Sequence, residues 1–482
     1  MNKTIRRASV FTLLLVLALL IRATWVQFHD STALADDKHN RRNAIEQYAH
    51  PLGDIIVGGE AITGSERTKG GDLAYKRTYK DGDLYSPVTG YSSQVFGATQ
   101  LEGIYKDLLD GTDNRLKNPL DTLTDKRADP GDVVTTIDPA VQKAGYKALG
   151  DTKGAAVAVD PKTGKILGMV STPSYDPSKI SGSTDSKMWK ELTTDKEKPM
   201  VNRAMRQPLP PGSTFKLVVA AAALEDGLYG SVDTRTASPN PYTLPGTRQV
   251  LHNENRSAPC ENADIRTALQ YSCNNVFAKM AVDLGQDKVK SMAEKLGFNA
   301  DKLDVPVRAG KSVYPSGMDK AQTGLSGIGQ FDVTATPLQM SMVSAAIANG
   351  GELVKPHMVS QISDADGNVL EKYDDAEAQR VMDESTAEGL QSAMRTVVDK
   401  GTGSNAKIPG ATVGGKTGTA QHGEKNSKTP YAWFTSYAKG GDGKEVAVAV
   451  MIESSSAARD EVSGNGLAAP IAKAMMQAAL KG

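Results

Sequence analysis

The chain has 482 residues, and its 56 acidic and 56 basic side chains leave a formal net charge of zero. With these charges balanced, the chain has no excess of basic residues that would attract nucleic acid, so a nucleic-acid partner is not expected. An acidic tail of the disordered kind is not indicated either. The length exceeds that of one ordinary domain, and a composition of 39% hydrophobic and 23% charged residues is typical of a globular protein with several parts.

Residues 1–28 predict a cytoplasmic tail and a transmembrane signal anchor. Basic residues at positions 3, 6 and 7 precede an apolar stretch that runs from Ala8 to Phe28 with Arg22 as its only charged residue. As a helix this stretch is about 30 Å long, enough to cross a bilayer. The leading positive charges favour a cytoplasmic N-terminus. The alternative is a cleaved signal peptide, because Ala33-Leu34-Ala35 has the form of a cleavage site, but it lies far beyond the apolar stretch. We expect a single-pass protein of the cell membrane in which everything after about residue 29 is extracellular.

Residues 29–134 are expected to form a small non-catalytic pedestal. The segment is polar and rich in turns, with strand-like pieces such as Ile55-Ile56-Val57 and a hairpin turn predicted at Lys80-Asp81-Gly82. A different pattern starts near Thr135, where Asp138-Pro139 predicts the start of a helix that continues through Leu149.

Residues 135–482 are expected to form one domain around a five-stranded antiparallel sheet. Strands are predicted at 155–159 and 166–172, a mostly helical middle follows, and strands return around Lys416, at 432–438 and at 446–452. A helix at 470–480 closes the chain. Strands at both ends of the region imply one sheet assembled from both ends, flanked by helices, which is an α/β fold of the α+β kind.

The tetrad Ser213-Thr214-Phe215-Lys216 is the first motif with chemical meaning. The serine opens a predicted helix and the lysine follows three residues later, so both side chains lie on one face one turn apart. The positive helix end and a second nearby cation would lower the lysine pKa, and the neutral amine could then take the serine proton. A second copy, Ser404-Asn405-Ala406-Lys407, lies in a glycine-rich loop without a following helix and is interpreted as a chance match.

Three Ser-x-Asn triplets follow the tetrad. Only Ser272-Cys273-Asn274 lies between two predicted helices, where a hydroxyl can relay a proton and an amide can hold a substrate peptide bond. Ser238-Pro239-Asn240 and Ser463-Gly464-Asn465 are interpreted as turns, because serine and asparagine favour local hydrogen bonds there.

Lys-Thr-Gly occurs twice. Lys162-Thr163-Gly164 lies in the predicted turn between the first two strands and needs no function. Lys416-Thr417-Gly418, followed by Thr419, has small neighbours in an extended segment, which lets a ligand backbone pair along the edge. A lysine in such a place can hold a carboxylate.

Cys260 and Cys273 leave two alternatives open. They can form a disulfide, which would add about 3 kcal/mol of stability in the chain-entropy model, or they can be two buried thiols. With two cysteines and no His-x-x-x-His spacing, we expect no metal site, and nothing indicates a cofactor.

The ordered set of Ser213, Ser272 with Asn274, and Lys416 resembles the class B penicillin-binding proteins, and most of all the actinobacterial penicillin-binding protein A group. The similarity extends over nearly the whole chain, with supporting segments at 89–93, 101–103, 329–330, 333–339 and 431–434. Leu52 departs from the family pattern, since related proteins often carry arginine there.

The resemblance implies a peptidoglycan D,D-transpeptidase that acts on stem peptides ending in D-alanyl-D-alanine and is the target of beta-lactams. Ser213 would attack, with the backbone N–H groups of Ser213 and Thr419 stabilising the oxyanion. The other implied roles are base for Lys216, proton relay for Ser272, donor orientation for Asn274, carboxylate binding for Lys416, and substrate binding for Thr417, Gly418 and Thr419. A glycosyltransferase of the SEDS family is the implied partner, since the pedestal has no polymerase motifs.

Three alternatives to a transpeptidase are considered. A beta-lactamase would need a deacylating base, and no Glu-x-x-x-Asn pattern follows Ser272. A D,D-carboxypeptidase, which passes the acyl group to water, stays open because an acceptor site has no readable motif. A non-catalytic scaffold for wall synthesis is disfavoured by the intact motifs.

Overall fold

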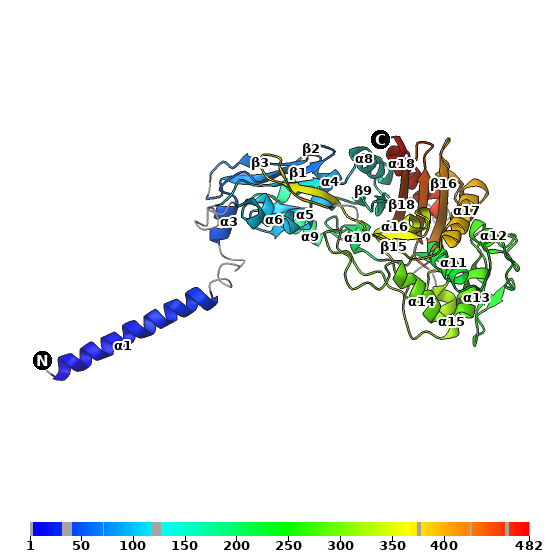
Figure 1. Cartoon of the computed structure of the whole chain (residues 1–482), viewed down its shortest axis with the longest axis horizontal. Helices are drawn as coiled ribbons and strands as arrows, with labels where there is room; N and C mark the ends of the chain where they lie inside the picture. The colour runs from blue at the N-terminus through cyan, green and yellow to red at the C-terminus, as the bar shows by residue number, and fades with distance from the viewer. Residues whose placement is uncertain are drawn as a thin grey trace.

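The computed structural model describes residues 3–30, 41–70, 72–117, 127–373, 377–421, 423, 427–457 and 462–481. Three parts follow one another along the chain: an N-terminal helix that stands apart, a region of short strands and helices, and a larger body around a five-stranded sheet (Figure 1).

The N-terminal helix is α1 (Lys3–Trp25), and the π-helical turn η1 (Val26–Asp30) continues it. The stretch Lys3–His29 is long and apolar enough to cross a membrane. Its apolar side chains are exposed, Leu13 to 69%, which is unfavourable in water and favourable in a bilayer. The helix is therefore suited to anchor the chain in a membrane. Ala33-Leu34-Ala35, the alternative cleavage site, lies outside the described residues.

The pedestal consists of short elements. They are α3 (Arg41–Gln47), β1 (Ile55–Val57), β2 (Glu60–Ala61), β3 (Thr63–Arg67), β4 (Tyr75–Tyr79), α4 (Gly82–Thr89), β5 (Ser92–Ser93), β6 (Gly97–Ala98), α5 (Gln100–Ile104), α6 (Lys106–Leu109), η2 (Asn114–Leu116) and β7 (Asp132–Thr135). The hairpin turn expected at Lys80-Asp81-Gly82 is wrong, because this segment joins β4 to α4. Asp81 takes a left-handed φ of 48° before a helix that buries Leu84 and Val88. The hairpin forms one strand earlier, between β3 and β4.

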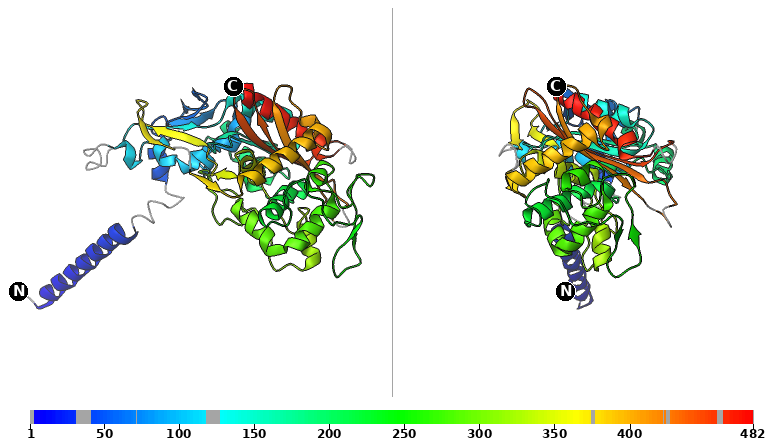
Figure 2. Two further views of the ribbon diagram at one scale, coloured as in Figure 1. Left: turned by 45° about the vertical axis from the view of Figure 1, so that its right-hand side comes forward. Right: turned by 90° about the vertical axis from the view of Figure 1, so that its right-hand side faces the viewer.

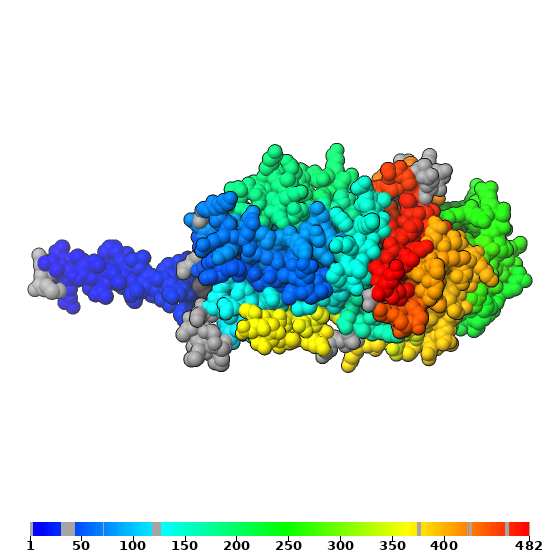
Figure 3. All heavy atoms as spheres, turned by 90° about the horizontal axis from the view of Figure 1, so that it is seen from above, coloured from blue at the N-terminus to red at the C-terminus, as the bar shows by residue number. Residues whose placement is uncertain are grey.

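Two strands from the second half of the chain complete the pedestal sheet. They are β13 (Val359–Ser363) and β14 (Val369–Lys372), and the sheet order is β14-β13-β7-β1-β2. Ile55 of β1 pairs with Val133 of β7, and Val133 pairs with Ile362 of β13; all three side chains are fully buried. The yellow segment beside the blue pedestal in Figure 3 contains these strands. The boundary predicted at residue 134 did not anticipate that these two later strands join the pedestal sheet.

The five-stranded antiparallel sheet predicted for the larger region is confirmed. Its order is β16-β17-β18-β8-β9, so the two early strands extend the three late ones through the β18–β8 pair. The strands are β8 (Lys153–Val159), β9 (Ile166–Thr172), β16 (Thr412–Ala420), β17 (Tyr431–Lys439) and β18 (Glu445–Ser454). β16 lies at one edge, and its outer backbone groups have no strand partner within the described residues.

Helices cover both faces of this sheet, as Figure 2 shows for α18 on one side and the green helices on the other. Alternate residues of β18 face opposite ways: Val450 belongs to the apolar cluster under α8 and α18, and Met451 to the main core that includes α11 and α16. The helices are η3 (Pro177–Ile180), α8 (Pro139–Leu149), α9 (Ser186–Thr194), α10 (Arg203–Arg206), η4 (Gly212–Phe215), α11 (Lys216–Glu225), α12 (Ile265–Gln270), α13 (Asn274–Leu284), α14 (Gln286–Lys295), α15 (Lys320–Ser326), α16 (Pro337–Ala348), α17 (Glu384–Lys400), η5 (Ser404–Ala406), η7 (Gly464–Ala468) and α18 (Ala469–Lys481), and the short strands are β10 (Tyr242–Thr243), β11 (Val250–Leu251), β12 (Glu352–Val354) and β15 (Ala378–Arg380).

Candidate active site

Ser213 lies in η4, a single 3-10 turn that runs directly into α11. Gly212 has a φ of 53°, and a Cβ there would meet the Thr419 carbonyl oxygen of β16 at 3.1 Å, so glycine lets the turn approach the strand. Phe215 fixes the other side of the turn by packing on Phe298 and Tyr314. The fully buried start of α11 and the close approach of β16 together hold the serine at the edge of the sheet.

A cleft of about 280 Å³ opens at Ser213. Three more of the predicted residues line it: Ser272, Thr417 and Thr419. Gly418, between the two threonines, is packed instead against the Pro211 carbonyl oxygen, which a Cβ would meet at 2.8 Å. Seven further lining residues were not predicted, namely Glu254, Asn255, Tyr271, Thr402, Ser463, Gly464 and Asn465.

Two buried lysines meet at Ser272. Lys216 Nζ donates to the Ser272 carbonyl oxygen at 2.8 Å and lies 3.3 Å from Ser272 Oγ. Lys416 Nζ, from β16, donates to the same Oγ at 3.0 Å and to the Thr417 carbonyl oxygen at 2.8 Å. Asn274 Oδ1 accepts a third hydrogen bond from Lys216 Nζ at 2.8 Å. The three predicted motifs are thus joined through one hydroxyl group.

The contact predicted between Ser213 and Lys216 is not among the hydrogen bonds of the described residues. Within the part of the chain that the structure describes, the hydrogen bonds of Lys216 Nζ go to Ser272 and Asn274, and none goes to Ser213. The lysine also lies 5.6 Å from the centre of the Phe277 ring. Lys216 is therefore held by Ser272, which lines the cleft, and by Asn274.

Family models match both folded parts of the chain. The model described as the penicillin binding protein transpeptidase domain matches residues 154–477, about two thirds of the sequence. The model of the penicillin binding protein A dimerisation domain matches residues 52–133. The chain belongs to the penicillin-binding protein transpeptidase family.

Named relatives and solved structures agree with this assignment. The peptidoglycan D,D-transpeptidase PbpA of Mycobacterium tuberculosis is 35% identical over 496 residues, which cover 100% of both chains. The protein of the same name from Mycolicibacterium smegmatis is also 35% identical and is covered to 99%. A structure of penicillin-binding protein A from M. tuberculosis, a ceftriaxone acyl-enzyme complex, has a TM-score of 0.83 at 34% identity and covers 90% of this chain and 100% of that one.

Burial tunes both lysines of this penicillin-binding protein. It lowers the pKa of Lys216 well below its usual value, the charge of Lys416 lowers it further, and Glu254 acts in the opposite direction. Burial also lowers the pKa of Lys416 to about 7, again against the influence of Glu254. The structure therefore supports the predicted low pKa of Lys216, with burial as its largest cause and the neighbouring cation as the second.

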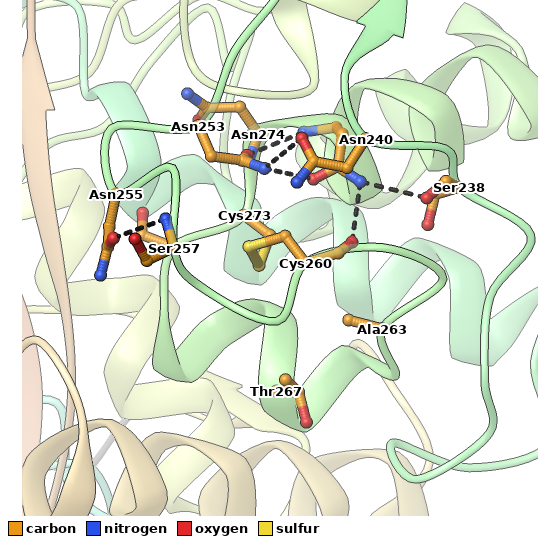
Figure 4. Close-up of a disulfide and its surroundings, with 12 residues drawn as sticks. Ser238, Asn240, Asn253, Asn255, Ser257, Cys260, Ala263, Thr267, Cys273 and Asn274 are labelled. Carbon is orange, nitrogen blue, oxygen red and sulfur yellow. Dashed lines mark hydrogen bonds between the residues drawn. A yellow bond between two sulfur atoms is a disulfide. The ribbon is translucent and has the colours of Figure 1, made fainter.

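The Ser-x-Asn motif of this transpeptidase is fixed by its middle residue. Cys273 forms a disulfide with Cys260, which decides between the two alternatives that the sequence left open. Ser272 has a left-handed φ of 58°, a conformation that costs a non-glycine residue about 1–3 kcal/mol unless its surroundings impose it. Asn253 adds a second restraint, because its Oδ1 accepts from the backbone N–H of Asn274 at 2.5 Å (Figure 4). The two residues that follow the strained serine are thus both fixed in position.

The other copies of the motifs have different positions. Lys162-Thr163-Gly164 lies in the β8–β9 turn as predicted, and Ser404 begins η5, a single 3-10 turn. Ser463 Oγ accepts from Gly466 N at 3.0 Å, the local hydrogen bond of a turn, yet Ser463, Gly464 and Asn465 also line the cleft. Interpreting this triplet only as a turn was therefore wrong. No local sequence signal indicated this position, which follows from the close approach of Gly464 to β17, where a Cβ would meet the Trp433 carbonyl oxygen at 2.3 Å.

Proposed function

We propose that the chain is a peptidoglycan D,D-transpeptidase that cross-links stem peptides through an acyl-serine intermediate, and that beta-lactams acylate the same serine. The observation that carries the proposal is the joining of three motifs at the cleft: Ser272 Oγ lies between Lys216 Nζ and Lys416 Nζ, and Ser272 and Ser213 line the same space. The names of the relatives support the same reaction and substrate.

Acylation begins at Ser213 Oγ. On substrate binding, Lys216 accepts the hydroxyl proton as its neutral amine, a form that its lowered pKa makes available. The oxygen attacks the carbonyl carbon of the penultimate D-alanine, and the backbone N–H groups of Ser213 and Thr419 stabilise the oxyanion. Ser272 passes a proton to the departing D-alanine, whose C–N bond breaks. The fixed position of Ser272 between two amines suits this relay.

The donor peptide binds along the edge of β16. Thr417 and Thr419 line the cleft on this strand, and Lys416 with Thr417 binds the terminal carboxylate. Gly418 contributes by letting the strand lie close to η4, and Asn274 orients the donor peptide bond from the opposite wall. An edge strand offers backbone groups for pairing with an extended ligand, which is the geometry that a stem peptide requires.

The arrangement of the whole chain follows the same proposal. α1 is a single membrane pass. Residues 29–134 form the pedestal, and residues 135–482 form the transpeptidase domain outside the cell. β13 and β14, although they lie in the second range, pair into the pedestal sheet. A separate glycosyltransferase of the SEDS family supplies the glycan strands. The orientation is tested with a cysteine added after Gly482 and a membrane-impermeant fluorescent thiol reagent applied to whole cells. Absence of labelling would contradict the orientation.

Covalent labelling tests the nucleophile. Full-length protein in detergent micelles is incubated with fluorescent penicillin, and the wild-type chain is expected to be labelled while Ser213→Ala is not. Ser404→Ala, in the second Ser-x-x-Lys copy, is the matched control and should be labelled as the wild type is. Labelling of Ser213→Ala would show that another residue is the nucleophile. Release of hydrolysed penicillin within minutes would instead identify a beta-lactamase.

A further inference from the structure

Glu254 is a carboxylate in the cleft that the proposed acylation chemistry does not use. Of the described residues that line the cleft with Ser213, it is the only acidic one. Its side chain is exposed, and it makes no hydrogen bond or ion pair with any described residue. Its negative charge nevertheless raises the pKa of both Lys216 and Lys416, against the effect of burial. An unpaired negative charge thus faces the space in which the acyl-enzyme reacts.

The backbone around Glu254 is held firmly although it lies in a loop. The preceding Asn253 is buried, and its Nδ2 donates to Asn275 Oδ1 at 2.9 Å and to Asn240 Oδ1 at 3.1 Å. The carbonyl oxygen of His252 accepts from Asn274 Nδ2 at 3.1 Å. Figure 4 shows Asn253, Asn240 and Asn274 gathered beside the disulfide. The loop is therefore tied to the Ser-x-Asn motif directly before Glu254.

The second half of a transpeptidation reaction brings an amine into the cleft. The acceptor amine is an ammonium group in water, and it must reach the ester carbonyl of acyl-Ser213. One proton leaves to solvent and frees the amine. The C–N bond then forms and the ester C–Oγ bond breaks, while the nitrogen gives up a second proton that reaches Ser213 Oγ through Lys216. The carboxylate bound at Lys416 leaves the cleft with the departing D-alanine, so Glu254 is the carboxylate among the described lining residues when the acceptor arrives, and its charge favours a cation.

We propose that Glu254 binds the ammonium group of the acceptor and holds it beside acyl-Ser213, which makes Glu254 a binding residue for the second substrate. The proposal rests on the proposed transpeptidase function. It assigns the acceptor class as a primary amine that arrives protonated. It also explains why the loop is fastened at Asn253, since a carboxylate on a loose loop would not position its ligand.

Competition between two acceptors tests this role. Full-length protein in micelles receives an N-acyl-D-alanyl thioester as donor, with either glycinamide, largely protonated at neutral pH, or hydroxylamine, largely neutral there. Glu254→Gln is expected to lower the selectivity for glycinamide over hydroxylamine about fivefold, the upper range for a solvent-exposed ion pair. Glu254→Asp should retain most of the selectivity. Glu261→Gln is the matched control, because Glu261 is exposed on the same loop but does not line the cleft.

The outcomes separate this inference from the proposed function. Unchanged selectivity in Glu254→Gln would overturn the acceptor role. Equal loss of transfer to both acceptors would also overturn it, because such a loss shows that Glu254 acts only through the lysines. If fluorescent penicillin fails to label the wild-type chain, the transpeptidase proposal itself is wrong; if labelling succeeds and selectivity does not change, only the assignment of Glu254 fails.

Discussion

The pedestal and the cleft both bury basic side chains, but they surround them differently. In the pedestal, Arg77 is fully buried and donates from Nε to Glu102 Oε1 at 2.6 Å, and Glu102 is itself buried. In the cleft, Lys216 and Lys416 are equally buried, yet neither forms an ion pair with a described carboxylate. Their hydrogen bonds go to neutral groups on Ser272, Asn274 and Thr417.

A neighbouring carboxylate decides whether a buried basic side chain keeps its charge. Burial opposes the charge of Arg77, but attraction to Glu102 and other nearby groups leaves the pKa of Arg77 raised, so this side chain stays charged and structural. Without such a partner, burial lowers the pKa of Lys216 and of Lys416. An amine that can lose its proton near neutral pH is chemically useful, and the fold bears the cost of its desolvation.

The largest expected effect is on the rate of acylation. Lys216→Met removes the proposed base, and the second-order rate of labelling by fluorescent penicillin should fall about 10² to 10⁴-fold, the usual contribution of a positioned base. Lys407→Met, in the second Ser-x-x-Lys copy, is the matched control and should label at the wild-type rate. A fall of less than tenfold for Lys216→Met would mean that another group accepts the proton.

Removing the carboxylate beside buried Arg77 should destabilise the pedestal. Glu102→Gln removes the buried counter-charge of Arg77 and leaves only the partly exposed Asp54 carboxylate, 3.6 Å away. Removing one partner of a buried pair costs about 3–5 kcal/mol of unfolding free energy, and Asp54 should keep the loss near the lower value. Hydrogen exchange of the β1, β4 and β7 amides measures this loss locally. Exchange at wild-type rates would show that Gly53, whose carbonyl oxygen accepts from Arg77 Nη1 at 2.7 Å, satisfies the arginine without Glu102.

The motifs proposed to act in catalysis could be recognised in the sequence because each is local. The three-residue spacing from Ser213 to Lys216 places both on one helical turn, and the small residues around Lys416 indicate an extended edge. The five strands were predictable for the same reason, since each carries its own pattern of β-branched and apolar residues. Local spacing also predicted the junction of two helices, where Ser272 lies between α12 and α13 and Asn274 begins α13.

Other features depend on contacts that no local pattern encodes. β13 joins the pedestal sheet through pairing with β7, whose residues lie more than two hundred positions earlier. Glu254 has its position because Asn253 and the Cys260–Cys273 disulfide fasten the loop to α13. Ser463 does form the turn that its sequence indicates. Its position in the cleft depends instead on the packing of η7 against β17.

Replacing the second lysine should stabilise the cleft while it impairs catalysis. The folded pKa of Lys416 is about 7, below its value of about 10.4 in an unfolded chain, so folding releases a proton between these values. The resulting cost is largest at and below pH 7 and disappears above the unfolded pKa. Lys416→Met should therefore raise the unfolding free energy at pH 7 by about 1–2 kcal/mol, with no gain near pH 11.

Two measurements check this trade-off. Thermal unfolding at pH 7 and at higher pH compares Lys416→Met with the wild type, and destabilisation at pH 7 would contradict the idea of an uncompensated buried amine. Penicillin labelling provides the second measurement. Because the charge of Lys416 lowers the pKa of Lys216, the rise of the labelling rate with pH should move to higher pH in the variant. An unmoved profile would show that the two lysines titrate independently.

The smallest effect is expected beside Arg77, on the exposed side of the same hairpin. Glu66 of β3 faces Lys76 of β4, and their charged atoms lie 2.8 Å apart, but the two side chains are 56% and 35% exposed. Water and salt screen such a pair, so Glu66→Gln should cost at most about 1 kcal/mol and less at high ionic strength. The same amide exchange on β4 measures it. A loss equal to that of Glu102→Gln would mean that charge on this hairpin matters regardless of burial, and the contrast between a buried pair and exposed charge would not hold.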